Sequence, residues 1–347
     1  MTNLITTERF AYRRERRDAK RAFSRCYFSL VVFIAVASVI ITGITVAALI
    51  LFGPERATAI LSNPYVTYGL QVVVMYMIAF PIFLLITLGL PRANYGKRSM
   101  GFGEFVSVFF ISCFAVTVGS FISYLLSLLI PSADQGVIDG FVIDTPLWLV
   151  IAVVVIIGPI VEEVVFRKVL IDRLGVYGDR RAIFVSAIAF GFFHGNPEQL
   201  FYATALGIIF GYVYAKTRKI IYPIILHMLI NLLGSVPAIL LSEILAEMET
   251  ITEEAAISGA DAIKYLFSVG LFLLVRYGFA LAGMAIFLYC IFAGKIRFSR
   301  NCHIRLKAGT ALRCSVFNLG AILFFLYFGL QIALYINPGL FDFLLSA

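Results

Sequence analysis

Two adjacent glutamates and an arginine interrupt an apolar stretch of the chain, "VVVIIGPIVEEVVFRKVLI" at residues 153–171. Ionisable groups in such a setting are costly unless they have partners, so they indicate a working site. On a helix, Glu163 and Arg167 are four positions apart with the carboxylate first, which is the favourable order for an ion pair. Glu162 points about 100° away from Glu163 and has no basic residue three or four positions away, so it is the candidate for chemistry.

Two of the three histidines also lie in apolar segments. The stretch "FGFFHGNPEQ" places His194 beside a Gly and a Pro that can end one helix and start the next. The stretch "HMLIN" places His227 four residues before Asn231, on one helix face. Phe190 and His194 have the same spacing, and we interpret the Phe190 ring as a wall that orients or desolvates the imidazole. His303 lies among basic residues in a loop, and we assign it no role.

A carboxylate, two imidazoles and a carboxamide around one point can activate a water molecule. Glu162 can take a proton from water, and the histidines can bind a metal or donate hydrogen bonds. The amide of Asn231 can help to hold a developing oxyanion. Each side chain could instead only join helices by hydrogen bonds, as His and Asn often do in membranes. Three polar clusters on three segments favour a functional site.

The composition places these residues in a lipid bilayer. Of 347 residues, 61% are hydrophobic and 14% are charged, and the mean hydropathy of +0.97 is far above that of soluble domains. Apolar runs of about 20 residues or more can cross a hydrocarbon core about 30 Å thick as helices. The sequence therefore predicts an all-α, polytopic transmembrane helical bundle, and not a barrel.

Charge and cysteine usage exclude other classes. The formal charge of +8 could indicate nucleic-acid binding, but the basic residues stand next to apolar runs, where membrane topology accounts for them. We therefore expect no nucleic-acid partner. The five cysteines show no CxxC spacing, which indicates packing residues and no thiolate metal site.

The predicted bundle has eight to nine spans, with a short broken helix pair near the candidate site. We expect a basic amino-terminal arm at residues 1–26 and a single transmembrane domain at 27–347. Gly207 and Gly211 form a GxxxG pattern that predicts a close-packing seam, whereas we interpret the aromatic run at 323–329 as lipid-facing. The spans are expected at about 27–53, 65–90, 104–130, 147–171, 181–195, 199–215, 220–242, 264–293 and 315–337.

The loops predict the orientation. The arm, the loops "PRANYGKR", "KTRK" and "KIRFSRNCHIRLK", and the connection at 172–181 are basic, whereas 131–146 and 243–261 carry mainly acidic residues. Because basic loops stay in the cytoplasm, we predict a multi-pass protein of the cell membrane with a cytoplasmic amino terminus. The arm could anchor the first span by its charge, or lie as a helix on an anionic membrane face.

The predicted depths of the polar residues do not fully agree. Counting about 1.5 Å per residue from the expected boundaries places Glu162 about 8 Å and His227 about 10 Å from the cytoplasmic edge, but His194 about 20 Å from it. A tilted short helix, or boundaries shifted by a few residues, would bring the three together.

The ordered set "EEVVFR", "FGFFH" and "HMLIN" resembles the three motifs of the CPBP intramembrane protease family, which includes the CAAX prenyl endopeptidase and bacteriocin-processing or self-immunity (Abi-type) relatives. The pattern EExxxR, FxxxH, HxxxN is met at every position, and the match covers about residues 147–235. The resemblance implies a peptidase in which Glu162 and His194 activate water and His227 and Asn231 stabilise the oxyanion. Glu163, Arg167 and Phe190 would have supporting roles.

The resemblance also bears on cofactors. The family is usually described as metalloproteases, which implies a divalent metal such as zinc with Glu162, His194 and His227 as ligands. The chain has no HExxH motif, and a catalytic zinc normally takes three protein ligands, so a metal-free glutamate peptidase is the alternative.

Three functions are compatible with these residues. The first is an intramembrane endopeptidase that cuts near the cytoplasmic membrane face, with the bilayer and a peptide or membrane-protein substrate as partners. Its substrate would be a prenylated CAAX-like, leader or membrane peptide. The second is a non-enzymatic scaffold or bacteriocin self-immunity protein. The third, a proton-coupled transporter, is the poorest because no inverted repeat is visible.

Overall fold

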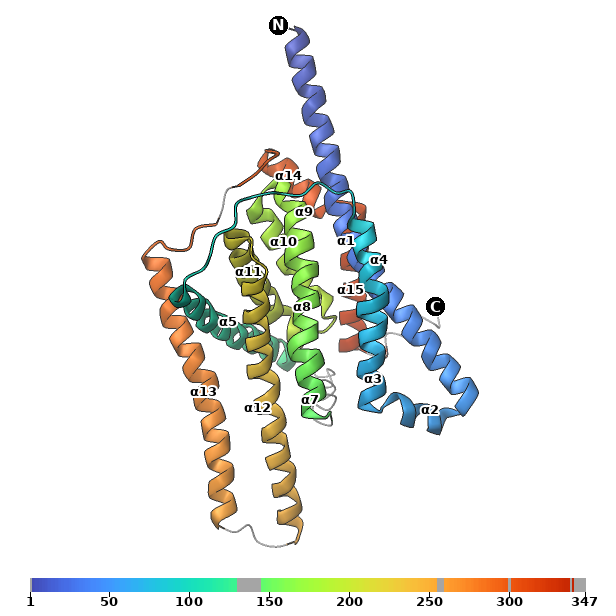
Figure 1. Cartoon of the computed structure of the whole chain (residues 1–347), viewed down its shortest axis with the longest axis vertical. Coiled ribbons are helices and arrows are strands. Elements are labelled where there is room, and N and C mark those ends of the chain that lie inside the picture. Colours follow the sequence, from blue (N-terminus) through green and yellow to red (C-terminus); the bar gives the residue numbers. More distant parts are fainter. Residues whose placement is uncertain (1, 130–144, 255–258, 299–300, 338, 340–347) are drawn as a thin grey trace.

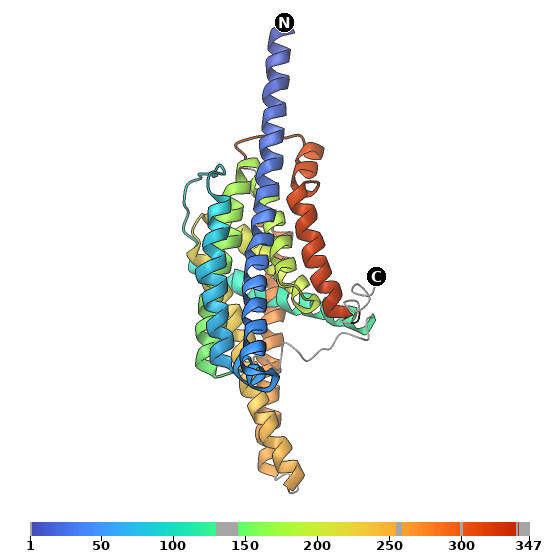
Figure 2. The same ribbon diagram turned by 90° about the vertical axis from the view of Figure 1, so that its right-hand side faces the viewer.

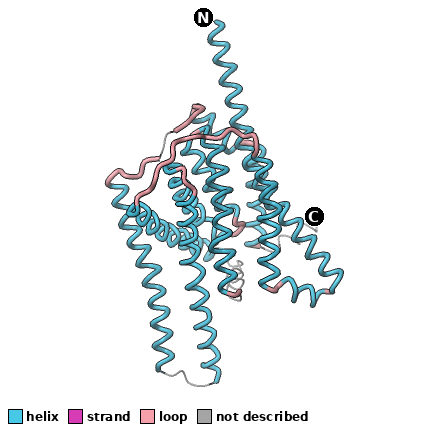
Figure 3. Tube along the Cα trace, viewed as in Figure 1, coloured by secondary structure: helices cyan, strands magenta, loops and turns pink. Residues whose placement is uncertain are grey.

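The computed structural model of the chain describes residues 2–129, 145–254, 259–298, 301–337 and 339. Figure 1 shows helices that run mostly side by side along the long axis of the molecule, and Figure 2 shows the same bundle from the side. All regular elements in these residues are helices (Figure 3). The predicted all-α class is confirmed.

Within the described residues, eight helical segments are long and apolar enough to cross a membrane. The predicted bundle of eight to nine spans is therefore confirmed. The remaining predicted span, at 181–195, is a helix of only 15 residues that begins at Asp179. The eight segments are Ala11–Phe52, Pro64–Thr87, Phe102–Leu128, Leu147–Tyr177, Pro197–Thr217, Ile221–Ser242, Ile263–Phe292 and Leu319–Ile336.

Some of these segments contain several helical elements in succession. The bounds are α1 Thr2–Phe52, α2 Pro54–Leu61, α3 Pro64–Gln71, η1 Val72–Ala79, α4 Phe80–Thr87, α5 Phe102–Leu129, α7 Leu147–Val150, η2 Ile151–Ile157, α8 Gly158–Glu163, η3 Val164–Ile171, α9 Asp172–Leu174, η4 Gly175–Tyr177, α10 Asp179–Phe193, α11 Pro197–Thr217, α12 Ile221–Glu254, α13 Gly259–Phe292, α14 Ala308–Val316 and α15 Leu319–Ile336.

The helix α1 is continuous from the basic arm through the first span. Residues 1–26 contain neither Pro nor Gly, so nothing in their sequence stops a helix. The first turns of α1 extend beyond the bundle (Figures 1 and 2), whereas Ala19, Phe23 and Cys26 are buried. The predicted arm is thus the start of one long helix, and its last turns pack against the bundle.

Three stretches, η1, η2 and η3, are wound as π-helix. Pro81 and Pro159 lie at the start of the helices that follow η1 and η2. Because proline lacks an N–H and clashes with the preceding turn, it disturbs the regular hydrogen-bond ladder at these points. Short π-helical turns are frequent at functional sites, and η2 and η3 lie on either side of α8, the helix that carries Glu162 and Glu163.

The helices α10 and α11 form the predicted broken pair. The chain leaves α10 at His194, passes through Gly195 with a φ of 69°, and starts α11 at Pro197. The Asn196 side chain caps α11 by accepting a hydrogen bond from the Gln199 backbone N–H at 2.9 Å. A left-handed glycine followed by a capping residue and a proline explains why the helix breaks here.

The two helices of this pair pack closely through glycines. A Cβ placed on Gly207 of α11 would lie 2.7 Å from the Cα of Ala187 on α10, and one on Gly211 would lie 3.1 Å from the Ile183 side chain. The predicted seam at Gly207 and Gly211 is therefore present. It fixes the position of α10, and so of His194 at its end.

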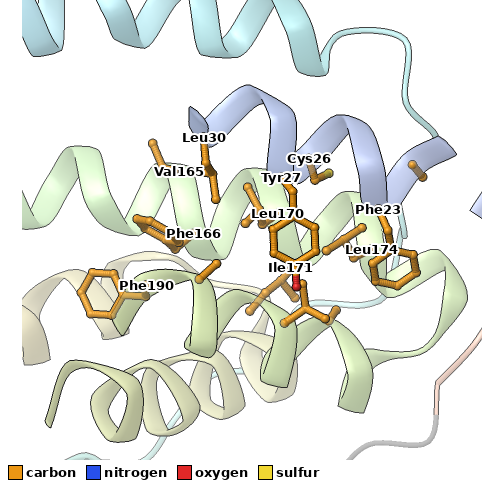
Figure 4. Close-up of a cluster of buried hydrophobic side chains, with 14 of the residues drawn as sticks. Phe23, Cys26, Tyr27, Leu30, Val165, Phe166, Leu170, Ile171, Leu174 and Phe190 are labelled. Carbon is orange, nitrogen blue, oxygen red and sulfur yellow. The ribbon is translucent and has the colours of Figure 1, made fainter. Parts of the chain in front are cut away.

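The largest core cluster joins α1 to the segment that carries the glutamates. Figure 4 shows Phe23, Tyr27 and Leu30 of α1 facing apolar side chains of η3. Phe324 and Phe328 of α15 are fully buried in this same cluster. The prediction that the aromatic run at 323–329 faces lipid is wrong for these two rings, because they lie on the face of α15 that packs on α1.

Candidate active site

Glu163 and Arg167 form the predicted ion pair inside the bundle. The Nε atom of Arg167 lies 3.0 Å from Oε2 of Glu163, and both side chains are fully buried. The guanidinium also lies 4.3 Å from the ring centre of Phe190 on α10 and 5.6 Å from that of Phe210 on α11. A guanidinium over aromatic faces gains cation–π attraction, so Arg167 connects η3 to both helices of the broken pair.

Glu163 also holds His227 of α12. Its Oε1 lies 2.9 Å from the Nδ1 of His227, and both groups are buried. A carboxylate only accepts, so Nδ1 carries the proton of this bond. In the neutral imidazole the other nitrogen, Nε2, is then free to accept a proton or a hydrogen bond.

Glu162 lies on the other side of this imidazole. Its Oε2 is 3.7 Å from Nε2 of His227, and 26% of its side chain is exposed, against none of Glu163. The distance is longer than a direct hydrogen bond, and the two groups attract strongly only when the imidazole is protonated. The two adjacent glutamates thus flank one histidine, and only Glu162 has an accessible carboxylate.

His194 joins the same cluster from the end of α10. Its Nδ1 lies 2.8 Å from the backbone carbonyl oxygen of Phe190. A carbonyl oxygen only accepts, so Nδ1 donates and Nε2 of the neutral ring is free. The Phe190 ring packs edge-on against both imidazoles, 4.9 Å from His194 and 5.7 Å from His227. Glu162 and His227 also lie within electrostatic range of His194. The depth difference expected from residue counting does not keep the two histidines apart.

Asn231 of α12 is bonded to the backbone of a neighbouring helical segment, a contact that its spacing from His227 does not predict. Its Nδ2 donates a hydrogen bond of 2.9 Å to the backbone carbonyl of Val154 in η2. The carboxamide is therefore anchored to the segment that carries Glu162, about two turns earlier. Nδ2 has two hydrogens, so one remains for another acceptor.

The expected metal ligands do not form a ready-made site. Among the residues that the structure describes, no three His, Cys, Asp or Glu side chains are grouped closely enough to hold a metal ion. A catalytic zinc usually takes three protein ligands. Glu162, His194 and His227, as arranged here, do not fit such an ion.

Two tyrosines near Glu162 were not anticipated from the sequence. Tyr76 of η1 and Tyr202 of α11 both lie within electrostatic range of the Glu162 carboxylate. They come from segments outside the motif that carries Glu162. The chain contains 17 tyrosines, and tyrosine is common in membrane proteins as an interfacial residue, so residue type alone could not single these two out.

Comparison with known proteins points to the same part of the chain. A family model described as "Type II CAAX prenyl endopeptidase Rce1-like" matches residues 144–233, which include Glu162, His194 and His227. The chain is 30% identical over 172 residues to "Putative membrane peptidase YdiL" of Bacillus subtilis (strain 168), which covers 47% of this chain and 69% of that protein.

A second relative matches a shorter part of the chain. The chain is 37% identical over 83 residues to "Membrane-embedded CAAX protease MroQ" of Staphylococcus aureus (strain USA300), which covers 22% of this chain and 34% of that protein. No solved structure matches the chain.

Proposed function

The chain belongs to the CPBP family of membrane-embedded CAAX-type endopeptidases, and we propose that it hydrolyses peptide bonds through a water molecule activated by Glu162 and His194. The observation that supports this most is the arrangement around His227. Glu163 holds its Nδ1 at 2.9 Å, and Glu162 lies 3.7 Å from its Nε2. A buried carboxylate thus fixes the ring, and an accessible carboxylate stands beside its free nitrogen.

In the first step, Glu162 acts as the general base. It takes a proton from water while the water oxygen bonds to the carbonyl carbon of the peptide. His194, with Nδ1 occupied by the Phe190 carbonyl, can accept a hydrogen bond from the same water at Nε2 and so orient it. The carbonyl oxygen becomes an oxyanion, and the unused N–H of Asn231 is the neutral donor available to it.

In the second step, the C–N bond breaks and the proton on Glu162 passes to the leaving amine. His227 can share that proton with Glu162, because its Nε2 faces the Glu162 carboxylate. The imidazolium that would form is stabilised at Nδ1 by Glu163. The oxyanion reforms the carbonyl group as the C–N bond breaks, the proton taken from water ends on the amine product, and Glu162 is again a carboxylate.

The family and the names of the relatives support a proposal for the substrate class. The matching model is described as a prenyl endopeptidase, and MroQ as a CAAX protease. We therefore propose as substrate a membrane-bound peptide that is prenylated and CAAX-like, with leader and transmembrane peptides as the alternatives. Cleavage is proposed near the cytoplasmic membrane face.

Purified protein in lipid nanodiscs tests this directly. Three internally quenched peptides serve as probes: a farnesylated peptide ending in Cys-aliphatic-aliphatic-X, the same peptide without farnesyl, and a bacteriocin-type leader peptide. The protein should cleave the farnesylated probe, and Glu162→Gln should lower turnover by about 100-fold or more while the protein still folds. Glu55→Gln, which changes an exposed glutamate of α2, is the matched control.

Unchanged cleavage by Glu162→Gln would contradict the proposed mechanism. No cleavage of any probe by the native protein, together with an unaltered cellular phenotype of Glu162→Gln, would favour the scaffold or immunity function.

The same assay tests whether turnover requires a metal ion. Because the three candidate ligands are not grouped as a metal site in the described residues, we predict that turnover persists in a chelator. Loss of turnover that added zinc restores would assign Glu162, His194 and His227 as ligands.

A further inference from the structure

Tyr76 is a residue that none of the three motifs contains, yet its hydroxyl reaches the helix that carries Glu162. A Cβ built on Gly158 of α8 would lie 3.4 Å from the Tyr76 hydroxyl oxygen. The hydroxyl therefore lies against the bare backbone at Gly158. Gly158 and Glu162 are four residues apart on one helix and share a face. The Tyr76 hydroxyl thus lies about one turn from Glu162, on the same side.

The position of Tyr76 along its span argues against an interfacial role. Tyrosines that anchor a span lie near its ends, at the headgroups. Tyr76 is in the middle of Pro64–Thr87, about 17 Å from either end at 1.5 Å per residue. Its hydroxyl also faces a neighbouring helix. The hydroxyl is therefore a polar group deep in the bundle, where it needs partners.

One neighbour is Gln71, whose side chain lies close enough to interact with the Tyr76 hydroxyl. The two residues are five positions apart, and η1 is a π-helix, whose hydrogen bonds run between residues five apart. The winding of η1 therefore brings these two side chains together. The Gln71 amide can donate to the hydroxyl oxygen, which leaves the hydroxyl proton for an acceptor.

A candidate acceptor for this proton is the Glu162 carboxylate. It lies within electrostatic range of Tyr76, it is partly exposed, and its Oε2 is 3.7 Å from His227 rather than in a direct hydrogen bond. Glu163, by contrast, is already shared between Arg167 and His227. Glu162 is thus the carboxylate that still has room for a donor.

We propose that Tyr76, held by Gln71, is a positioning residue that donates its hydroxyl to Glu162 and keeps the carboxylate directed toward His227. A glutamate has three rotatable side-chain bonds, so a second anchor reduces the reorganisation needed when it acts as a base. The contact itself does not depend on the proposed function, whereas its effect on catalysis does.

The contact is tested by a double-mutant cycle in thermal unfolding. Tyr76→Phe, Glu162→Leu and the double variant are compared in the same nanodiscs. If the hydroxyl binds the carboxylate, the Tm shifts of the two single variants are not additive. Their sum differs from the Tm shift of the double variant by about 1–2 °C. Tyr27→Phe, which removes a hydroxyl from the buried core on α1, should be additive with Glu162→Leu. Additive shifts for Tyr76→Phe would overturn the contact.

The catalytic consequence is tested with the farnesylated probe. Tyr76→Phe should lower kcat about tenfold and leave KM unchanged, because the hydroxyl acts on the base and not on the substrate. Gln71→Leu should lower kcat less, and Tyr27→Phe should change neither value. A rise in KM with unchanged kcat would overturn the positioning role. If Glu162→Gln cleaves as well as the native protein, the proposed function fails, and the unfolding cycle still decides the Tyr76 contact.

Discussion

Glu162 and Glu163 are neighbours in the sequence, but the fold places them in opposite environments. Successive residues on a helix point about 100° apart. Glu163 consequently faces Arg167 and His227 in the closed interior, while Glu162 keeps 26% of its side chain exposed. The Glu163 carboxylate, which is bonded through both oxygens, is suited to holding Arg167 and His227 in place. The Glu162 carboxylate, which is partly exposed, is suited to proton transfer.

This difference predicts unequal effects on stability. Glu163→Gln leaves the buried Arg167 without its counter-charge, and breaking a buried ion pair in this way costs about 3–5 kcal/mol. Glu162→Gln should cost much less. Unfolding by heat or denaturant in detergent measures the loss of stability in both variants. The double variant Glu163→Gln, Arg167→Met should recover much of the loss, because it removes both charges. A Glu163→Gln variant as stable as the native protein would contradict the ion pair.

At this scale the sequence predicts contacts that are local in the chain. The pair Glu163 and Arg167 follows from four-residue spacing on one helix. The bond from Glu163 to His227 spans 64 positions, and the bond from Asn231 to the Val154 carbonyl spans 77. Such contacts depend on how helices pack, which spacing within one helix does not contain. The sequence therefore predicts that Asn231 faces the site, but not that its amide is anchored on η2.

At the scale of elements, the break between α10 and α11 is predictable because Gly and Pro mark it in the sequence. The π-helical winding of η1, η2 and η3 is not, because the same Val-rich and Ile-rich residues form ordinary α-helix elsewhere. Pro81 and Pro159 indicate a disturbed turn, but not its type. The pairing of Gln71 with Tyr76 depends on that winding, and for this reason the motifs do not reveal it.

The close packing of α10 and α11 gives a prediction at the scale of elements. A Cβ on Gly207 would lie 2.7 Å from Ala187 Cα, so Gly207→Ala must push the two helices apart. We expect a loss of about 1–3 kcal/mol in unfolding free energy, and lower turnover because His194 moves with α10. Gly278→Ala on α13 is the matched control, since nothing lies within 4 Å of a Cβ there. Equal effects of both substitutions would show that this seam does not position His194.

At the scale of the whole molecule, the basic loops gather at one end. The loop at 88–101 makes backbone hydrogen bonds to the ends of neighbouring segments. The Ala93 N–H donates to the Asp172 carbonyl at 2.7 Å, and the Arg98 N–H donates to the Thr217 carbonyl at 2.9 Å. Asp179 N–H bonds the Asn301 carbonyl, from the other long basic loop, at 3.1 Å. The first turns of α1 project from this same end, while α12 and α13 extend beyond the bundle at the other (Figures 1 and 2).

This arrangement predicts the orientation of the whole bundle in the membrane. Since the separate basic segments share one end, a single orientation satisfies all of them, and the positive-inside rule predicts that this end is cytoplasmic. In a cysteine-free background, Lys97→Cys on the 88–101 loop should resist a membrane-impermeant maleimide in intact cells and react after permeabilisation. Lys264→Cys, near the far end of α13, should react in intact cells. The opposite labelling pattern would invert the bundle, and the proposed cleavage near the cytoplasmic face would have to be abandoned, because His227 lies only six residues from the start of α12 at that same end.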